Sequence, residues 1–302
     1  AGGHNLIMVG PPGGGKTLLA SCVPSILPAM DDSEALEVTC IQSITGTVSP
    51  AGLARKRPFR RPHHTVSPAG MLGGGNPPMP GEVTLAHRGV LYLDEFCEFR
   101  PQVIESLRGP MEDGFIIVSR SSGRVSFPSR FMLIASANPC PCGYLGDPER
   151  ACVCQGASLM RYRRRLAGPV IDRIDIQIEV PRVRRIDLER PVAFLTSDSV
   201  RHEIEHARER QSERFCRNGF TNSAMGPRHI ESIARLAPEA RRLLLDAVDQ
   251  MALSARAYHK LIRVSRTIAD LDGVDSVGEG HVLEALQYRT LDSEPQAVLS
   301  YG

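Results

Sequence analysis

The chain has 302 residues, of which 42% are hydrophobic and 23% charged, and these values are typical of a globular protein of about two domains. Its formal net charge of +2 is too small to indicate a nucleic-acid or membrane partner by itself. No stretch reaches the roughly 18 consecutive apolar residues of a membrane span. The start also lacks a secretory signal pattern, so we expect no membrane association and a cytoplasmic location. The chain begins at AGGHN without a Met, and we expect an N-terminal portion to precede it.

The first predicted element is a short buried strand over residues 6–9, which a glycine-rich loop follows directly. The loop fits the pattern G-x-x-x-x-G-K-[ST] with Gly10, Pro11, Pro12, Gly13, Gly14, Gly15, Lys16 and Thr17. A helix is predicted from about residue 16 to 26. Backbone N–H groups of such a loop and of the first helical turn, up to Leu18, bind phosphate oxygens, so we expect an ATP site here. Lys16 would reach the outer phosphates and the Thr17 hydroxyl would hold Mg²⁺; a chance glycine-rich turn is the alternative.

Residues 38–81 contain no acidic side chain but include a basic cluster, namely Arg55, Lys56, Arg57, Arg60 and Arg61. This cluster could bind a DNA backbone or pair with acidic residues of an adjacent subunit, and both interpretations stay open. The neighbouring His63 and His64 are interpreted as hydrogen-bonded structural residues, because two adjacent side chains of an irregular segment rarely chelate one ion. Residues 73–75 predict a flexible turn rather than a second phosphate loop, since no Lys follows them.

A second buried strand is predicted over residues 90–93, and it ends in Asp94 and Glu95. Ligands of open parallel α/β sheets bind at the carboxyl ends of the strands. We therefore expect Asp94 to hold Mg²⁺ and Glu95 to orient or deprotonate the attacking water of ATP hydrolysis. An apolar run followed by two acids is a weak signal alone, and it gains its meaning from the phosphate loop upstream.

The next two elements are a β-hairpin over residues 115–127 and a strand over residues 131–137. The hairpin has apolar arms and carries Arg120 and Arg124 at its tip, where they are either DNA contacts or ordinary solvated side chains. The strand ends at Asn138. In P-loop proteins with an added strand between the two motif strands, a polar residue here contacts the γ-phosphate or the attacking water. Asn138 is therefore a candidate phosphate sensor, with a simple Asn-Pro turn as the alternative.

Four of the eight cysteines follow Asn138 closely: Cys140, Cys142, Cys152 and Cys154. Four thiols on short spacings suit a closed tetrahedral Zn²⁺ site, which leaves no open position for catalysis. Because Cys-x-Cys is tighter than the usual Cys-x-x-Cys spacing, redox-sensitive disulfides and a cluster without metal remain alternatives. The scattered cysteines, Cys22, Cys40, Cys97 and Cys216, are interpreted as packing residues.

After about residue 190 the pattern becomes helical, with helices predicted over 200–217, 238–253, 256–271 and 278–288 and a loop over 216–229. We therefore predict two domains. The first, residues 1–190, is an α/β core in which helices cover both faces of a parallel sheet. The second, residues 191–302, is a small α-helical lid domain.

Taken together, five stretches resemble the magnesium-chelatase-like ComM/YifB family of AAA+ ATPases. They are residues 57–75, 80–96, 137–143, 161–180 and 254–273. The elements PHHT (62–65) and NPCPCG (138–143) are specific to that family. The resemblance implies a P-loop AAA+ core with β-hairpin insertions and a helical lid. Family members also carry an N-terminal domain similar to a Lon-protease accessory fold, which is not part of these 302 residues.

The resemblance also implies roles for single residues. Arg173 matches the arginine finger that reaches the γ-phosphate held by a neighbouring subunit, and Arg256 matches the second sensor on the lid. The residues alone do not distinguish Arg173 from a run of nearby arginines, Arg163, Arg164 and Arg165. The family forms homo-oligomeric rings, here expected to be hexameric, with the 115–127 hairpin in the central pore and the 38–81 segment as a second insertion.

The resulting hypothesis is an ATP-hydrolysing ring motor on DNA, such as a branch-migration helicase in homologous recombination and natural transformation. Two alternatives stay open. A magnesium-chelatase-type motor would drive metal insertion into a porphyrin through partner subunits, and its ATP turnover would ignore DNA. A MoxR-like remodeller would act on proteins and displace no annealed strand.

Overall fold

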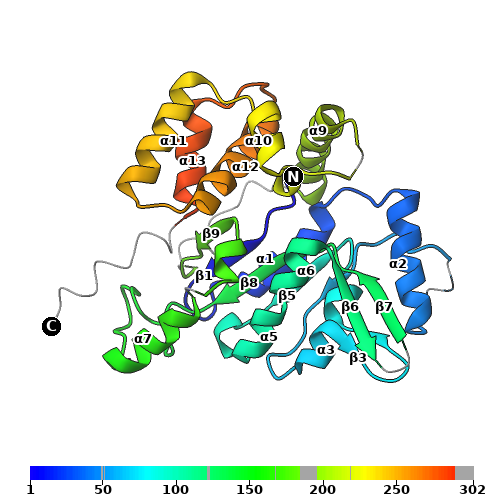
Figure 1. Cartoon of the computed structure of the whole chain (residues 1–302). Helices are drawn as coiled ribbons and strands as arrows, with labels where there is room; N and C mark the ends of the chain where they lie inside the picture. The colour runs from blue at the N-terminus through cyan, green and yellow to red at the C-terminus, as the bar shows by residue number, and fades with distance from the viewer. Residues whose placement is uncertain are drawn as a thin grey trace. The chain divides into compact units, whose positions relative to one another are not determined.

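The computed structural model describes residues 1–48, 50, 52–120, 123–166, 168–183, 196–217 and 219–289 (Figure 1). By their contacts these residues form two compact units. The first, the helical unit, combines residues 1–6 and 174–179 with the described residues from 196 to 289. The second, the core unit, comprises residues 7–173 and 180–183. Two short segments distant from each other in sequence therefore belong with the helices of the C-terminal part.

The central element is a five-stranded sheet in the order β2-β5-β8-β1-β9. Its strands are β1 (Leu6–Val9), β2 (Phe59–Arg60), β5 (Val90–Leu93), β8 (Met132–Ala137) and β9 (Ile176–Glu179). Strand β5 pairs in parallel with both neighbours, β2 and β8. Every residue of β5 is buried, as expected for an inner parallel strand. Strand β8 lies between the two strands that carry the nucleotide motifs, which confirms the predicted α/β P-loop AAA+ core.

Short helices accompany this sheet: α1 (Lys16–Ile26), α2 (Asp32–Ile44), α3 (Pro68–Leu72), α4 (Glu82–Leu85), α5 (Pro101–Ser106), α6 (Arg108–Asp113) and α7 (Gly156–Arg165). Local sequence explains where several of them begin. The Asp31 side chain accepts the Glu34 N–H at 2.8 Å and so caps α2. Pro68 and Pro101 occupy first-turn positions of α3 and α5, where a missing N–H costs nothing.

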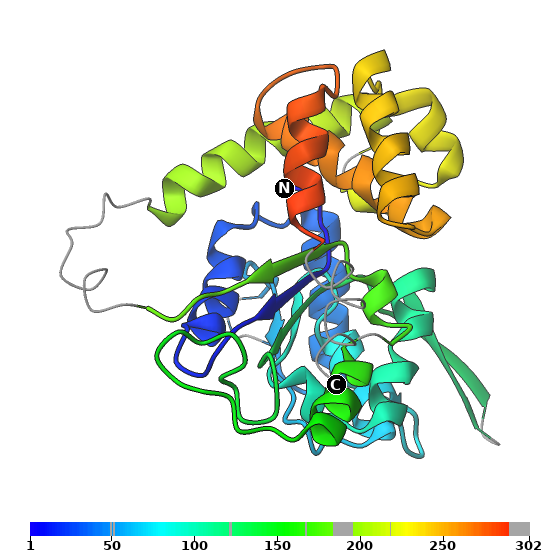
Figure 2. The ribbon, with the colours of Figure 1, turned by 90° about the vertical axis from the view of Figure 1, so that its left-hand side faces the viewer.

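Two antiparallel ribbons complete the core unit: β3 (Gly73–Gly74) with β4 (Met79–Pro80), and β6 (Phe115–Arg120) with β7 (Gly123–Pro128). The second ribbon is the predicted hairpin, and it extends away from the sheet (Figure 2). Its side chains alternate, with Ile116 and Val118 buried and Phe115 and Ile117 exposed. The period of two thus gives the hairpin one packed face and one free face.

The helical unit contains α9 (Ser197–Phe215), α10 (Pro227–Ile233), α11 (Pro238–Gln250), α12 (Ala255–Leu271) and α13 (Glu279–Gln287). Helix α12 is buried along most of its length and packs against α9 and α13. The predicted loop over 216–229 is wrong at its end, because α10 already begins at Pro227. Proline is well accepted in a first helical turn, so the residue that predicted a break starts the helix instead.

A buried polar network stabilises this unit around Asp270, whose side chain is inaccessible. Asp270 accepts hydrogen bonds from Arg214, Arg266 and Asn222. The fully buried Arg266 also donates to the carbonyls of Val274 and Asp275 at 2.5 Å each. Every charge in the network has partners, as burial of ions requires. Among the described helices, none combines the length and the apolar character needed to pass through a lipid bilayer.

Candidate nucleotide-binding site

The phosphate loop connects β1 to α1, and its glycines are required by the backbone. Gly13 and Gly15 have φ values of 81° and 78°, in the left-handed region that favours glycine. A Cβ on Gly10 would lie 2.0 Å from the carbonyl oxygen of Val180, so the chain after β9 also requires glycine there. In a glycine-rich loop before a helix, the backbone N–H groups of the loop and of the first helical turn bind phosphate oxygens.

Lys16 points back over this loop. Its ammonium donates to the carbonyls of Gly10 at 2.6 Å and Pro11 at 2.8 Å, and lies 3.4 Å from the side-chain oxygen of Asn138. Burial lowers the pKa of Lys16, and the nearby carboxylates of Asp94 and Glu95 oppose that effect. The two polar residues predicted to meet the outer phosphates, Lys16 and Asn138, are therefore neighbours.

Asp94 lies at the carboxyl end of β5 beside the phosphate loop. The Thr17 hydroxyl donates to its Oδ2 at 3.2 Å, and the Ser136 and Tyr92 hydroxyls lie 2.6 and 2.9 Å from its Oδ1. Burial raises the pKa of Asp94, but the hydrogen bonds from Ser136 and Tyr92 and the charge of Arg61 outweigh it and hold the pKa below its usual value. Asp94 is therefore a carboxylate at neutral pH, as a metal ligand must be.

Glu95 adopts a left-handed backbone with a φ of 53°. Its N–H points to Asp94 Oδ1 at 3.1 Å and to Ser136 Oγ at 3.3 Å, so these oxygens favour the unusual conformation. Its side chain is 60% exposed and its carboxylate lies 3.9 Å from the His64 Nδ1. A carboxylate that projects from the strand end into solvent is accessible to water, as the predicted role in hydrolysis requires.

The residues present fit a magnesium nucleotide. Mg²⁺ prefers oxygen ligands and takes one or two carboxylates together with substrate phosphates and water. Thr17 Oγ1 and Asp94 Oδ2, which are 3.2 Å apart, offer such oxygens next to the phosphate loop. When bound, Mg²⁺ would supply positive charge against the phosphate oxygens.

Two further residues of this site, Tyr92 and Ser136, are absent from the sequence prediction. Each lies two positions before a predicted site residue, Tyr92 before Asp94 and Ser136 before Asn138. Alternate residues of a strand share a face, so the spacing of two positions from Asp94 and Asn138 could have predicted Tyr92 and Ser136 as site residues. The hydroxyls of Tyr92 and Ser136 are 3.1 Å apart and connect the two strand ends.

The basic cluster of residues 55–61 is largely paired within the chain. Its ion pairs are Arg55 with Asp32, Arg57 with Glu34, Arg60 with Glu82, and Arg61 with Asp94. Arg57 also donates to the carbonyls of Pro28 and Arg88, and its side chain is only 15% exposed. Arg61 joins the nucleotide site itself. Lys56 is exposed. Arg57 and Arg60 thus have structural contacts, whereas Arg55 and Lys56 lie on the surface.

The hairpin presents Arg124 on β7, opposite Ser119 and exposed. The side chain of Arg120 lies outside what the structure describes. The His63 and His64 rings are tilted by 34° with their centroids 4.1 Å apart, and His63 forms a hydrogen bond of 2.9 Å with the Thr65 hydroxyl. Residues 73 and 74, predicted as a turn, instead form strand β3.

Arg173 ends a short turn of 3₁₀ helix, η2 (Ile171–Arg173), and is 8% exposed. Its guanidinium donates to the carbonyl of Pro169 at 2.7 Å and pairs with Glu112 at 2.5 Å. Arg164, one of the sequence alternatives, lies exposed on α7. Arg256 lies exposed in the first turn of α12, within the helical unit, where Ser254 caps the helix.

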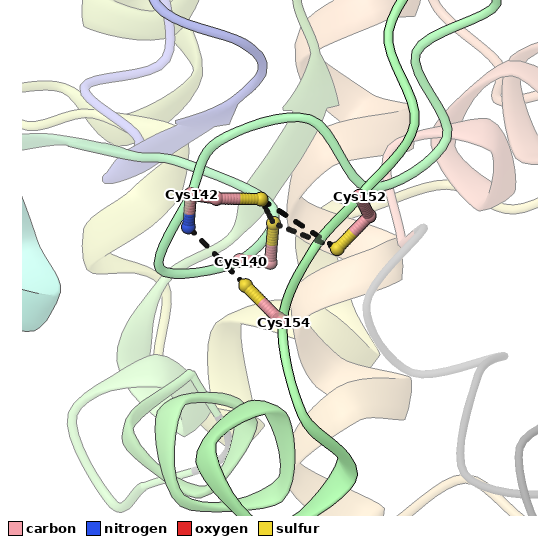
Figure 3. A group of neighbouring side chains, drawn as sticks. All are labelled: Cys140, Cys142, Cys152 and Cys154. Atoms are coloured by element: carbon pink, nitrogen blue, oxygen red, sulfur yellow. Dashed lines mark hydrogen bonds between the residues drawn. The ribbon is translucent and has the colours of Figure 1, made fainter.

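The four clustered cysteines bring their sulfur atoms together (Figure 3). Cys140 and Cys142 come from one limb of the loop and Cys152 and Cys154 from the other. Sulfur–sulfur distances are 3.3 Å for Cys140–Cys142, 3.7 Å for Cys140–Cys152 and 3.6 Å for Cys142–Cys152. All four lie within 4.8 Å of one another, and no other His, Cys, Asp or Glu group in the described part of the chain has this arrangement.

Within this cluster the pKa of the Cys142 thiol is lowered, whereas the pKa values of the Cys140 and Cys154 thiols are raised by burial and by hydrogen bonds among the thiols. Hydrogen bonds from the backbone of Tyr144 and Val153 lower the pKa of the Cys142 thiol to about 6. Thiolates are the form in which cysteine binds metal. Four thiolates arranged as a tetrahedron at ~2.3 Å from Zn²⁺ have their sulfurs about 3.8 Å apart. Two of the three sulfur–sulfur distances given above are close to this value, and the Cys140–Cys142 distance of 3.3 Å is shorter. The donor set and its geometry therefore fit Zn²⁺.

Comparison with known proteins agrees with this geometry. Residues 1–188 match the family model described as magnesium chelatase, subunit ChlI, and residues 195–289 match the model of the ChlI C-terminal part. The chain belongs to the magnesium chelatase ChlI family. This ChlI-family chain thus has both parts that the family models describe, the P-loop core and the helical C-terminal part.

Among its relatives, the chain is 42% identical over 293 residues to the competence protein ComM of Haemophilus influenzae, covering 96% of this chain and 56% of ComM. It is 41% identical over 294 residues to YifB of Escherichia coli, covering 97% of this chain and 57% of YifB. The magnesium-chelatase 38 kDa subunit of Rhodobacter capsulatus is 26% identical over 210 residues, which is 67% of this chain and 51% of that subunit. The chain therefore spans little more than half the length of these relatives.

Proposed function

We propose that this ChlI-family chain is the motor part of an ATP-hydrolysing AAA+ ring that moves along or remodels DNA in the cytoplasm. The observation that carries the proposal is the 3.2 Å contact between Thr17 and Asp94, next to Lys16 and Asn138. A phosphate-loop hydroxyl, a strand-end carboxylate and a polar sensor within one site are the parts that nucleoside-triphosphate hydrolysis needs.

The residues divide the proposed reaction between them. The phosphate-loop N–H groups and Lys16 bind the phosphates, while Thr17 and Asp94 would hold Mg²⁺. The exposed carboxylate of Glu95 orients the attacking water and accepts its proton. Asn138 would contact the γ-phosphate, so that loss of this phosphate changes a contact at the end of β8.

Assembly into a ring follows from the proposed role of Arg173. A guanidinium supplied by the neighbouring subunit makes hydrolysis depend on assembly, and we propose a homohexamer with Arg256 as the second sensor. For Arg173 to act in this way, its guanidinium must leave the Glu112 carboxylate and contact the γ-phosphate bound by the neighbouring subunit. Glu112 is 47% exposed, so the pair lies at the surface on the Glu112 side.

The DNA role rests on the hairpin and on the relatives. Arg124 is exposed on a hairpin that projects from the sheet, and Arg55 and Lys56 are further exposed basic side chains. Arginines repeated around a ring would contact a phosphate backbone without reading its sequence. The similarity to a competence protein supports a function in natural transformation, and we propose branch migration during homologous recombination as the specific activity.

We further propose that Cys140, Cys142, Cys152 and Cys154 hold one structural Zn²⁺. Metal analysis of the purified protein should find about one zinc per chain, as a closed four-thiolate site requires. A protein purified under reducing conditions with no zinc, and unable to take it up, would refute this part.

Glu95→Gln tests the central proposal. The variant should keep nucleotide binding but lose both ATP turnover and displacement of annealed strands from a branched DNA. Glu98→Gln, which changes an exposed carboxylate three positions further on, is the matched control and should keep both activities. An assembled wild-type ring that hydrolyses ATP but displaces no strand at any salt concentration would exclude the DNA motor.

One alternative has support of its own. The 26% identity to a magnesium-chelatase subunit supports a motor that drives metal insertion through partner subunits. In that case ATP turnover would respond to a partner protein and not to DNA. A MoxR-like protein remodeller would likewise leave annealed strands intact. Strand displacement thus separates the DNA motor from both alternatives, and stimulation of ATP turnover by a metal-insertion partner subunit would separate the chelatase-type motor from the remodeller.

A further inference from the structure

The segment from residue 139 to residue 155, here called the cysteine loop, joins β8 to α7 without a helix or strand of its own. Loops longer than about 15 residues inside a compact domain are usually functional. The start of this loop lies at the nucleotide site. Asn138 precedes it and contacts Lys16, and Tyr162 on α7 receives a hydrogen bond from the backbone of Asn138.

The cysteine loop packs on the phosphate loop at Gly143. Gly143 follows Cys142, has a φ of 85°, and donates its N–H to the Cys140 carbonyl at 3.0 Å. A Cβ at this position would lie 2.6 Å from Pro12 Cδ. Real Cβ atoms do not approach other atoms so closely, so the glycine is needed for the cysteine loop to rest on Pro12.

A second segment that contacts the phosphate loop also pairs with the cysteine loop. The carbonyl oxygens of Val180 and Pro181 lie 2.0 and 3.3 Å from where Cβ atoms of Gly10 and Gly14 would be. The next residue, Arg182, forms an ion pair of 3.2 Å with Glu149 in the cysteine loop. Two segments thus contact the phosphate loop, one within the cysteine loop and one joined to it by a surface ion pair.

We propose that the metal-bound cysteine loop is a clamp that sets the shape of the phosphate loop, and that loss of the metal weakens nucleotide binding. The proposal rests on the nucleotide site and the zinc site proposed above. Metal ligation closes the two limbs of the loop on each other, and without it the loop regains the conformational freedom that the metal removed. Gly143 then no longer presses on Pro12, and the phosphate-binding N–H groups lose their fixed arrangement.

Metal removal is the first test. Zinc is released from the wild-type chain with an organomercurial and a chelator, the mercurial is removed with thiol, and binding of a fluorescent ATP analogue is titrated before and after. The metal-free protein should bind the analogue about tenfold more weakly, the effect of losing one charge-assisted hydrogen bond to phosphate. Adding Zn²⁺ back should restore the affinity. Unchanged affinity in a folded, metal-free protein would overturn the clamp.

Gly143→Ala tests the contact without touching the metal. The variant keeps all four thiols and should keep about one zinc per chain, but its methyl group displaces Pro12 and should weaken binding of the analogue about tenfold. Gly146→Ala is the matched control, because Gly146 lies in the same loop with a φ of 79° and nothing within 4 Å of its Cβ position. That variant carries the same backbone strain and should bind like wild type.

The outcomes separate the two proposals. Wild-type protein that holds zinc but binds no nucleotide refutes the nucleotide site itself. Protein that binds nucleotide with equal affinity in the wild type, the Gly143→Ala variant and the metal-free form refutes only the clamp. Equal weakening by Gly143→Ala and Gly146→Ala would mean that loop strain, and not contact with Pro12, controls the affinity.

Discussion

The guanidinium of Arg61 lies 2.5 Å from Oδ2 of Asp94, the same oxygen to which the Thr17 hydroxyl donates. Arg61 also lies over the Tyr92 ring, with its Cζ 5.7 Å from the ring centroid. Arg61, which the sequence analysis named as a candidate DNA contact, thus forms an ion pair with Asp94, the carboxylate proposed to hold Mg²⁺. Mg²⁺ and Arg61 would compete for one oxygen.

Arg61→Gln should therefore lower the Mg²⁺ concentration needed for half-maximal ATP turnover. We expect a change of about threefold, since a partly exposed ion pair contributes less than ~1 kcal/mol. The measurement is a Mg²⁺ titration of ATP hydrolysis at saturating ATP. Arg55→Gln is the control, because Arg55 pairs with Asp32, and both of these side chains are well exposed. If Arg61→Gln instead raises the Mg²⁺ requirement, Arg61 assists the metal site rather than competing with it.

His87 should make the stability of the core unit depend on pH. Its Nδ1 accepts the Arg130 N–H at 3.0 Å, so the proton is on Nε2, which lies 3.0 Å from Glu37. Burial lowers the pKa of His87 from its usual 6.5, although Glu37 opposes this. Above pH 6.5 neither the folded nor the unfolded state binds the extra proton. Below it the unfolded state binds the proton first, so stability falls as pH falls.

The expected loss is up to about 1.4 kcal/mol for each pH unit below 6.5, until the folded-state pKa is reached. Urea unfolding at about pH 7.5 and about pH 5.5 would measure it. His87→Gln should be less stable than wild type at the higher pH but should lose less stability on acidification. A variant with the same pH dependence as wild type would show that other groups cause it.

Arg173→Ala should reduce ATP turnover about 1000-fold, the usual effect of removing an arginine finger, with little change in nucleotide affinity. Mixing this variant with Glu95→Gln should partly restore turnover, because a ring can then combine an intact water-activating site with an intact finger from its neighbour. Arg164→Ala, on the exposed face of α7, is the comparison. Loss of turnover in Arg164→Ala but not in Arg173→Ala would transfer the role to α7. Thermal melting separates any loss of the Arg173–Glu112 pair from loss of chemistry.

Arg124→Glu should weaken DNA binding while leaving ATP turnover without DNA unchanged, since the side chain is exposed on the hairpin. If it contacts phosphate, the slope of log affinity against log salt should become shallower by about one per replaced contact. Arg242→Glu reverses an exposed charge on α11 and serves as the control. If the two variants bind DNA with equal affinity, the hairpin is not part of the DNA-binding surface.

The core of the site could be predicted because its chemistry is local in sequence. The strand–loop–helix order at residues 6–26 has the predicted boundaries, and so does the strand over residues 90–93 that Asp94 follows. Glycines forced by positive φ and acids at strand ends leave a signature within a few residues.

Contacts between distant residues left no such signature. Arg57 pairs with Glu34, Arg60 with Glu82 and Arg61 with Asp94, across 22 to 33 positions. The sequence of residues 38–81 predicts an unpaired basic surface because the acidic partners of its arginines lie outside this stretch. Burial of Arg173 and packing of Gly143 on Pro12 likewise depend on tertiary structure, which single-sequence patterns do not encode.

At the end of β5, the backbone conformation of Glu95 lowers the stability of the fold, while its side chain is proposed to act in hydrolysis. A glutamate with a φ of 53° is held in a conformation that costs about 1 kcal/mol and that glycine or asparagine would adopt more easily. Glu95→Gly should thus raise the melting temperature of the protein and abolish its ATP hydrolysis. The backbone at the end of β5 is thus less stable with glutamate than with glycine, which is the stability cost of placing a carboxylate at this position.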